Sequence, residues 1–349
     1  MALNNETNIT AGDSSTNNQA QTINNTFNGV SYRDVKEIAL DVFKDNFLVF
    51  RNEAAEIATA RATEIIEKLL ERLEDGAIPL DEFATPGMQD SLFSAQKEYA
   101  MSGDEEVADM LVEILVQRAQ TPEKNRFRIV LDESLKVASK LTIQQMDLLT
   151  VSHAMRHMKV LNQTTLNGLY ERLDVYLSFF DGIDEGEVDK DLSVLEYLNL
   201  GKISVEEYTN PASFFLKAYP AFFNKGFDES ECLIPELGNE DILISCLRNN
   251  KKLQFQFSEK VDLISFLRSK SITESRINEI ASFFDVNIFT PEELISEING
   301  KVNNFSKAMS LHNNTNWKCF QLSPVGKAIA MSNFYRKTNQ KLNMSTWID

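Results

Sequence analysis

The sequence is poor in the residues that build metal centres and disulfide-stabilised folds. Its 349 residues include only three cysteines and three histidines. The cysteines are too few and too scattered for a disulfide framework or a zinc knuckle, and this scarcity is typical of a protein from a reducing cytoplasm. General bases and metal ligands are in short supply as well. We therefore expect a cytoplasmic protein without a bound metal or cofactor.

Glycine-rich phosphate loops and long apolar runs are also missing. Glycine accounts for 13 residues, and neither a Walker loop nor a dinucleotide-binding fingerprint occurs. No window of 18 apolar residues could span a bilayer, and the N-terminus lacks the charged and apolar stretches of a secretory signal. Nucleophile signatures and paired nuclease carboxylates are absent too. We therefore expect no enzymatic activity, although scattered residues could still assemble an active site that one sequence does not reveal.

Charge is distributed unevenly along the chain. The sequence has 35 basic and 52 acidic residues, for a net charge of −17, which is too negative for a protein whose whole surface binds nucleic acid. From Lys301 onward the charge is +6, so the first 300 residues carry −23. This basic end could bind a phosphate backbone, or it could dock onto the acidic body of its own or a neighbouring subunit, which we favour. The candidate contact residues are Lys318, Lys327, Arg336 and Lys337.

Residues 1–29 form a leader rich in asparagine and threonine, with almost no charge. Such a segment cannot bury enough apolar surface to become ordered in a monomer. Two interpretations stay open, a disordered tail and strands that pair between identical chains. We expect the leader to be ordered only within a homo-oligomer.

Residues 30–78 show a continuous helical pattern of apolar residues. The pattern runs from Val35 to Leu73, and no proline or glycine interrupts it before Gly76. It predicts one amphipathic helix of about 40 residues, which is long enough to act as an oligomer seam. A helical hairpin packed within one subunit is the alternative. The seam residues would be Val35, Val42, Phe43, Phe47 and Phe50.

The remaining chain reads as a central helical domain at 79–202 and a C-terminal helical domain at 203–349. The fold class is therefore mainly α, a helical bundle with a long N-terminal helix and a small wing-like β-ribbon. Helices are expected at 88–101, 104–120, 123–139, 142–160, 164–181, 192–200, 239–249, 259–269, 273–284, 291–311 and 324–338, with strands at 202–208, 254–257 and 317–322. The phenylalanine-rich run at 214–227 is expected to form loops and core plugs, and strand 317–322 is expected to pair with 202–208.

One pair of histidines has the spacing of a helical metal site. His153 and His157 lie four residues apart, so a helix would place both imidazoles on one face. A metalloprotease helix of this kind needs a glutamate directly after the first histidine, and here that residue is Ala154. No third ligand is suitably spaced. We therefore interpret the pair as structural.

Several short motifs resemble those of bacterial abortive-infection proteins of the Abi-alpha type. The helical stretch at 107–157 carries an element similar to theirs, and a later pair of motifs resembles the two strands of a winged-helix wing. The element consists of Leu141, Thr142, Gln145 and Leu149, and the later motifs are Leu200-Gly201-Lys202-Ile203 and the run from Phe320 to Ala328. The chain departs from that pattern by an insertion at 203–316 between the two strands.

The two ends of the chain are similar to an uncharacterised bacterial family with an Asn-rich leader, associated with anti-phage islands. The similarity lies in Gly29 to Tyr32 and in Trp347-Ile348. Together, the resemblances imply a self-assembling, non-enzymatic component of anti-phage defence, triggered by a phage protein or nucleic acid. A nucleic-acid-binding regulator that uses the winged-helix-like basic segment is the alternative.

Overall fold

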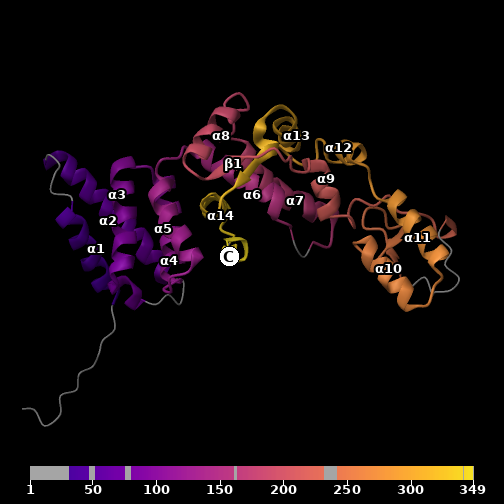
Figure 1. The fold of residues 1–349 in the computed structure, drawn as a ribbon, viewed down its shortest axis with the longest axis horizontal. Coiled ribbons are helices and arrows are strands. Elements are labelled where there is room, and N and C mark those ends of the chain that lie inside the picture. The colour runs from indigo at the N-terminus through magenta and orange to yellow at the C-terminus, as the bar shows by residue number, and fades with distance from the viewer. Residues whose placement is uncertain are drawn as a thin grey trace, which may run out of the picture.

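The computed structural model describes residues 31–46, 52–74, 80–160, 163–231, 242–340 and 342–348. The protein is mainly helical and contains two antiparallel sheets of two strands each among these residues. Three groups of elements follow one another along the long axis of the molecule (Figure 1). None of the described helices has the length and apolar character needed to cross a membrane.

The N-terminal group consists of five helices and a 3₁₀ turn. These are α1 (Tyr32–Asn46), α2 (Asn52–Glu74), η1 (Leu80–Ala84), α3 (Pro86–Ser102), α4 (Glu105–Ala119) and α5 (Arg126–Ala138). The first two helices double back on each other, because Lys36 Nζ lies 3.0 Å from Glu67 Oε1, 31 positions further along. In one straight helix these residues would be about 46 Å apart. The prediction of a single long helix is therefore wrong. The structure instead contains the alternative, a helical hairpin packed within one chain.

Two of the three described side chains that were assigned to an oligomer seam are buried within one chain. Val35 and Phe43 are 0% and 1% exposed, and Phe43 packs with Ala58, Ala62 and Ala100. Val42 is half-buried. Neither Val35 nor Phe43 thus offers a surface to a second chain, which corrects their assignment to a seam. Phe47, Phe50 and the leader at 1–29 lie outside the described residues.

The central group holds most of the remaining helices and the first sheet. It comprises α6 (Ile143–His157), α7 (Leu166–Leu177), η2 (Ser178–Phe180), α8 (Val188–Tyr197), β1 (Gly201–Ile203), α9 (Pro211–Ala218), α12 (Pro291–Ile298), α13 (Phe305–Asn314), η5 (Asn316–Cys319), β4 (Phe320–Leu322) and α14 (Pro324–Thr338), and α15 (Ser345–Ile348) follows. Local sequence sets several helix starts. Thr142 and Thr290 each form a capping box with the residue three positions later, and Ser323 caps α14.

The expected pairing of the two distant strands is confirmed in a shorter form. Strand β1 pairs antiparallel with β4, with Lys202 opposite Gln321. Trp317 does not belong to the strand, because Thr315 caps the 3₁₀ turn η5 by accepting a hydrogen bond from the Trp317 backbone. A Cβ on Gly326 would lie 1.9 Å from the Leu200 carbonyl oxygen, so glycine is what lets α14 approach the ribbon this closely.

The third group is a small unit between α9 and α12 with its own core. It comprises η3 (Glu229–Glu231), β2 (Leu243–Ser245), β3 (Leu253–Phe255), α10 (Lys260–Ser269) and α11 (Glu274–Asn287). Its core includes Phe227, Phe255 and Phe284. The helix expected at 239–249 is wrong where the structure describes it, because β2 pairs with β3 there.

Two further expectations, one of a single helix and one of loops, need correction. The helix expected at 291–311 is two helices, α12 and α13, and both Gly300 and Asn304 between them have positive φ angles. Part of the phenylalanine-rich run is helical, because Asn210 caps α9 and Pro211 occupies its first position. Phe214 and Phe215 therefore lie on a helix rather than in a loop.

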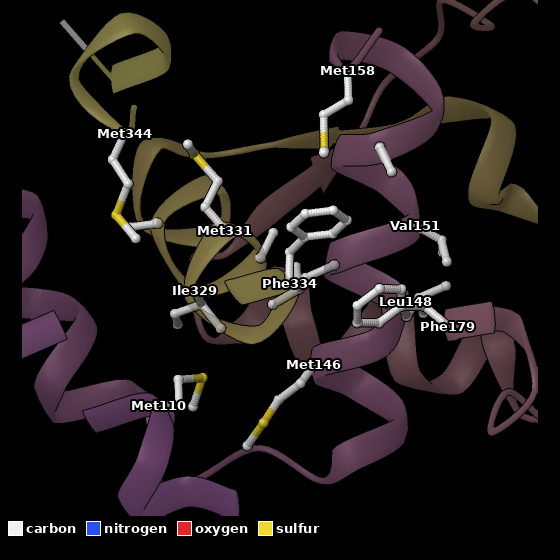
Figure 2. Packing of buried hydrophobic residues seen from close by; sticks show 14 of the residues in the cluster. Met110, Met146, Leu148, Val151, Met158, Phe179, Ile329, Met331, Phe334 and Met344 are labelled. Atoms are coloured by element: carbon white, nitrogen blue, oxygen red, sulfur yellow. The ribbon is translucent and has the colours of Figure 1, made fainter. Parts of the chain in front are cut away.

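Helix α14 joins the N-terminal and central groups into one hydrophobic core. Figure 2 shows Ile329, Met331 and Phe334 of this helix between Met110 of α4 and Val151 of α6. All five side chains are fully buried. The last long helix of the chain is thus the element that fixes α4 relative to α6.

Candidate anion-binding site

A pocket of about 270 Å³ lies where the C-terminal end of α6 meets α9 and the segment after β1. Its wall combines apolar and aromatic side chains with three cations. The lining residues are Met155, Arg156, Lys159, Tyr208, Thr209, Phe214, Lys217 and Ala218. No aspartate or glutamate is among them, in a chain whose net charge is −17. The pocket is therefore a local positive site on an acidic protein.

Arg156 supplies the most deeply placed positive charge. It projects from the last turn of α6, and its Nη1 and Nη2 donate to the carbonyl oxygens of Phe320 and Trp317. The centre of its guanidinium lies 4.0 Å from the centroid of the Tyr208 ring and 5.3 Å from that of Trp317. Carbonyl dipoles and ring faces thus hold this cation in a fixed orientation.

Burial lowers the pKa of Arg156 to about 10, so the guanidinium remains charged at neutral pH. The other groups that shift this pKa are Tyr208 and Cys319, and neither is a carboxylate. Arg156 is half-buried, and a charge partly withdrawn from water gains from the approach of an anion when no carboxylate is beside it. Arg156 therefore gives the pocket an affinity for negative charge.

Two lysines stand at the exposed side of the same pocket. Lys159 follows α6, whereas Lys217 lies in the last turn of α9, and both are exposed. Ammonium groups on flexible stems can reach a ligand from different directions. A narrow extension of about 10 Å³ shares Arg156 and Tyr208 and reaches His312 and Trp317. Burial lowers the pKa of His312, with Lys318 as the next cause, so this imidazole is neutral at pH 7.

The four basic residues singled out from the sequence do not form this site. Lys318 Nζ lies 2.8 Å from Glu207 Oε1, Lys337 Nζ lies 2.6 Å from Asp147 Oδ2, and Arg336 Nη1 lies 3.3 Å from Glu106 Oε2. Lys327 is on α14, where its charge helps to lower the pKa values of His153 and His157. Three of the four candidates are thus engaged by carboxylates of the same chain.

A protein-family model whose description names no particular protein matches residues 29–348, nearly the whole chain. The chain belongs to this family. No curated protein and no solved structure matches the chain in the other two comparisons. Because the family description names no activity, ligand or partner, the chemistry of the site has to come from its own residues.

The family match extends over every residue of the pocket, but sequence reasoning did not identify the site. In the segment His153 to His157, the i, i+4 spacing singles out the two histidines, whereas the residue that reaches the pocket is Arg156 between them. Its partners Tyr208 and Lys217 are more than 50 positions away. Only the packing of α9 against α6 brings these groups together.

The two histidines themselves are buried in or near the core. Their ring centroids are 5.3 Å apart, and burial lowers the pKa of His153 to about 3 and that of His157 to about 4. Among the described residues, no three side chains of histidine, cysteine, aspartate or glutamate are grouped to hold a metal ion. The low pKa values of the pair therefore make its charge state matter for stability.

We expect His153 to make the fold sensitive to mild acid. Its pKa is lower in the folded than in the unfolded chain, so its stabilising contribution is complete above about pH 6.5 and is lost as the pH falls below that value. Between pH 7.5 and pH 5.0 the loss should be about 2 kcal/mol. Urea unfolding at the two pH values, compared between the wild type and His153→Gln, measures it. The variant should lose about 2 kcal/mol less, and equal losses in both proteins would contradict the expectation.

Proposed function

We propose that this protein is a non-enzymatic binding protein that recognises an anionic ligand in the Arg156 pocket. The observation that carries the proposal is a half-buried guanidinium held by carbonyl oxygens and aromatic rings, with no carboxylate lining the pocket around it. A site that holds its charge in place before the ligand arrives loses little entropy on binding. An incoming anion would compensate this charge.

The lining favours binding over catalysis. It offers positive charge, ring faces and the thioether of Met155, and none of its lining residues is a carboxylate, histidine or thiol that could activate the Thr209 hydroxyl as a nucleophile. The acidic remainder of the protein would repel anions elsewhere and leave this pocket as a local attractive site. Sensing, rather than turnover, is the role that such a pocket suits.

The biological setting of this role is the one that the resemblance to abortive-infection proteins implies. We propose that the chain acts in bacterial anti-phage defence, where it senses a phage-related product and passes the signal on through self-assembly. The alternative, a nucleic-acid-binding regulator with a wing-like ribbon, has less support because Lys318, Arg336 and Lys337 are paired with carboxylates.

The proposal is tested by reversing the two exposed charges of the pocket. A double variant with Lys159→Glu and Lys217→Glu should bind the aryl sulfonate 8-anilinonaphthalene-1-sulfonate about tenfold more weakly than the wild type. Two partly screened charges at about 0.7 kcal/mol each account for that factor. Fluorescence titration of the folded full-length protein measures the affinity and the number of bound dyes.

A second double variant, Lys202→Glu with Lys251→Glu, is the matched control. Both of these lysines are exposed and lie away from the pocket, so the net charge changes equally while the site stays intact. The control should bind the dye as the wild type does. If both double variants lose affinity equally, or if the wild type does not bind the dye, the pocket is not an anion site.

A further inference from the structure

We infer that the ligand of the Arg156 pocket is an organic phosphate, a phosphate monoester carried on a single flat ring. This inference rests on the proposed function, because it names the class of anion that the same pocket would take. Three features of the lining carry it: the number of charges, the different mobility of the cations, and the apolar wall beside them.

The number of charges distinguishes a phosphate monoester from a simple carboxylate. Arg156, Lys159 and Lys217 bring three positive charges to the lining, and no acidic side chain among the lining residues offsets them. A carboxylate carries one negative charge, whereas a phosphate monoester carries about −1.5 to −2 at pH 7. Only the latter compensates most of the charge that the pocket concentrates.

The cations differ in what they can offer to the ligand. Arg156 is fixed by its bonds to the carbonyls of Trp317 and Phe320, so it mainly contributes a stationary charge at the inner wall. Lys159 and Lys217 are exposed and keep their ammonium donors available at the mouth. Lysine binds phosphate as a point charge without demanding a planar partner. The tetrahedral oxygens of a phosphate suit this mixed arrangement.

The apolar wall requires more than an inorganic ion. Met155, Phe214 and Ala218 line the pocket together with the cations, and one face of Tyr208 is already covered by Arg156. Phosphate alone would leave these apolar side chains without a partner. A flat ring attached to the phosphate would cover Phe214 and Met155 and bury apolar surface that the ion leaves in water.

The size of the pocket limits the ligand to a small molecule. Its volume of about 270 Å³ lies just below the usual range of about 300–1,000 Å³ for ligand pockets. A single ring with one phosphate group fits that scale, and a folded nucleic acid does not. The expected ligand is thus a small aryl monophosphate rather than a polymer backbone.

Phenyl phosphate and benzenesulfonate form the matched pair of probes. Both carry a tetrahedral anion on a benzene ring, but the sulfonate has one negative charge and the phosphate about two near neutral pH. Calorimetric titration of the full-length protein at pH 7.5 should show phenyl phosphate binding at least tenfold more tightly than benzenesulfonate and inorganic phosphate. At pH 5.5, where the phosphate loses its second charge, its advantage over benzenesulfonate should shrink to about threefold or less.

Two lysine variants distinguish binding in the pocket from a general effect of net charge on the affinity for anions. Lys217→Ala should weaken phenyl phosphate more than benzenesulfonate, and the exposed Lys202→Ala should change neither. Equal affinity for the two aryl anions would overturn the phosphate inference and leave the proposed function standing. Inorganic phosphate binding as tightly as phenyl phosphate would overturn the requirement for a ring. If none of the probes nor the aryl sulfonate dye binds, the proposed function itself fails.

Discussion

Replacing Phe43 with alanine is expected to lower the free energy of unfolding by about 3–5 kcal/mol, the usual cost of truncating a fully buried phenylalanine. The ring is 1% exposed and lies in a cluster with Ala58, Ala62 and Ala100, whose short side chains could not refill the space. The cluster connects α1 to α2 and α3, so its loss should loosen the helical hairpin. Urea unfolding of the full-length protein measures the change.

The position of Phe43 within one chain gives this prediction a second readout. Light scattering should show the same molar mass for the wild type and Phe43→Ala, since the ring does not lie on a surface that a second chain could cover. Ile57→Ala on α2 is the matched control, because Ile57 is 55% exposed and should cost less than 1 kcal/mol. A change in molar mass with unaltered stability would restore the interpretation of α1 as an oligomer seam.

Lys337→Met is expected to cost about 3 kcal/mol, because it leaves the carboxylate of Asp147 buried without its cation. Asp147 is 1% exposed, and its Oδ2 lies 2.6 Å from Lys337 Nζ. Lys337 itself keeps about a third of its side chain exposed, which places the cost at the lower end of the range for a buried pair. Chemical unfolding at pH 7.5 is the measurement.

A double variant shows whether the loss of stability comes from the Asp147 carboxylate left without its cation. Adding Asp147→Asn to Lys337→Met should recover more than half of the lost stability, because the amide needs no cation. The same proteins can be applied to a heparin column. Retention that weakens with salt in the wild type and disappears in Lys337→Met, without any change in stability, would instead favour the nucleic-acid-binding interpretation of the basic end.

Local signals in the sequence were enough to place most of the helices. Thr142 with Gln145, and Thr290 with Pro291 and Glu293, mark helix starts that the structure contains. Such caps act within one turn, so their energy does not depend on distant packing. The pairing of β1 with β4 was also predicted from the sequence, in which both segments have alternating patterns and a glycine close by.

Elements that depend on distant contacts were predicted less well. The apolar stripe through α1 and α2 is the same for one long helix and for a hairpin, and only the approach of Lys36 to Glu67 distinguishes the two. Leu243 and Ile244 lie in a strand because β3 lies beside them, although their spacing also fits a helix. Tertiary partners decide such segments.

The candidate site was beyond the reach of sequence reasoning for a similar reason. The basic residues near the C-terminus stand out because they cluster along the chain, yet Lys318, Arg336 and Lys337 are paired with Glu207, Glu106 and Asp147. The cations of the pocket do not cluster along the chain. The basic residues that are close together in the sequence pair with carboxylates of the same chain. The three cations of the pocket come close to one another only in the folded protein.

The unit built from β2, β3, α10 and α11 leaves the central group and returns to it at one point. Asn224 bridges Ile288, the backbone nitrogen of Lys225 donates to the carbonyl of Asn287 over 2.7 Å, and that of Phe289 donates to Phe223 over 2.9 Å. The unit is therefore an inserted subdomain, since hydrogen bonds join the two points at which the chain enters and leaves it. Because the chain enters and leaves the unit at neighbouring positions, a change of length inside the unit would leave the two ends where they are and the fold of the central group intact.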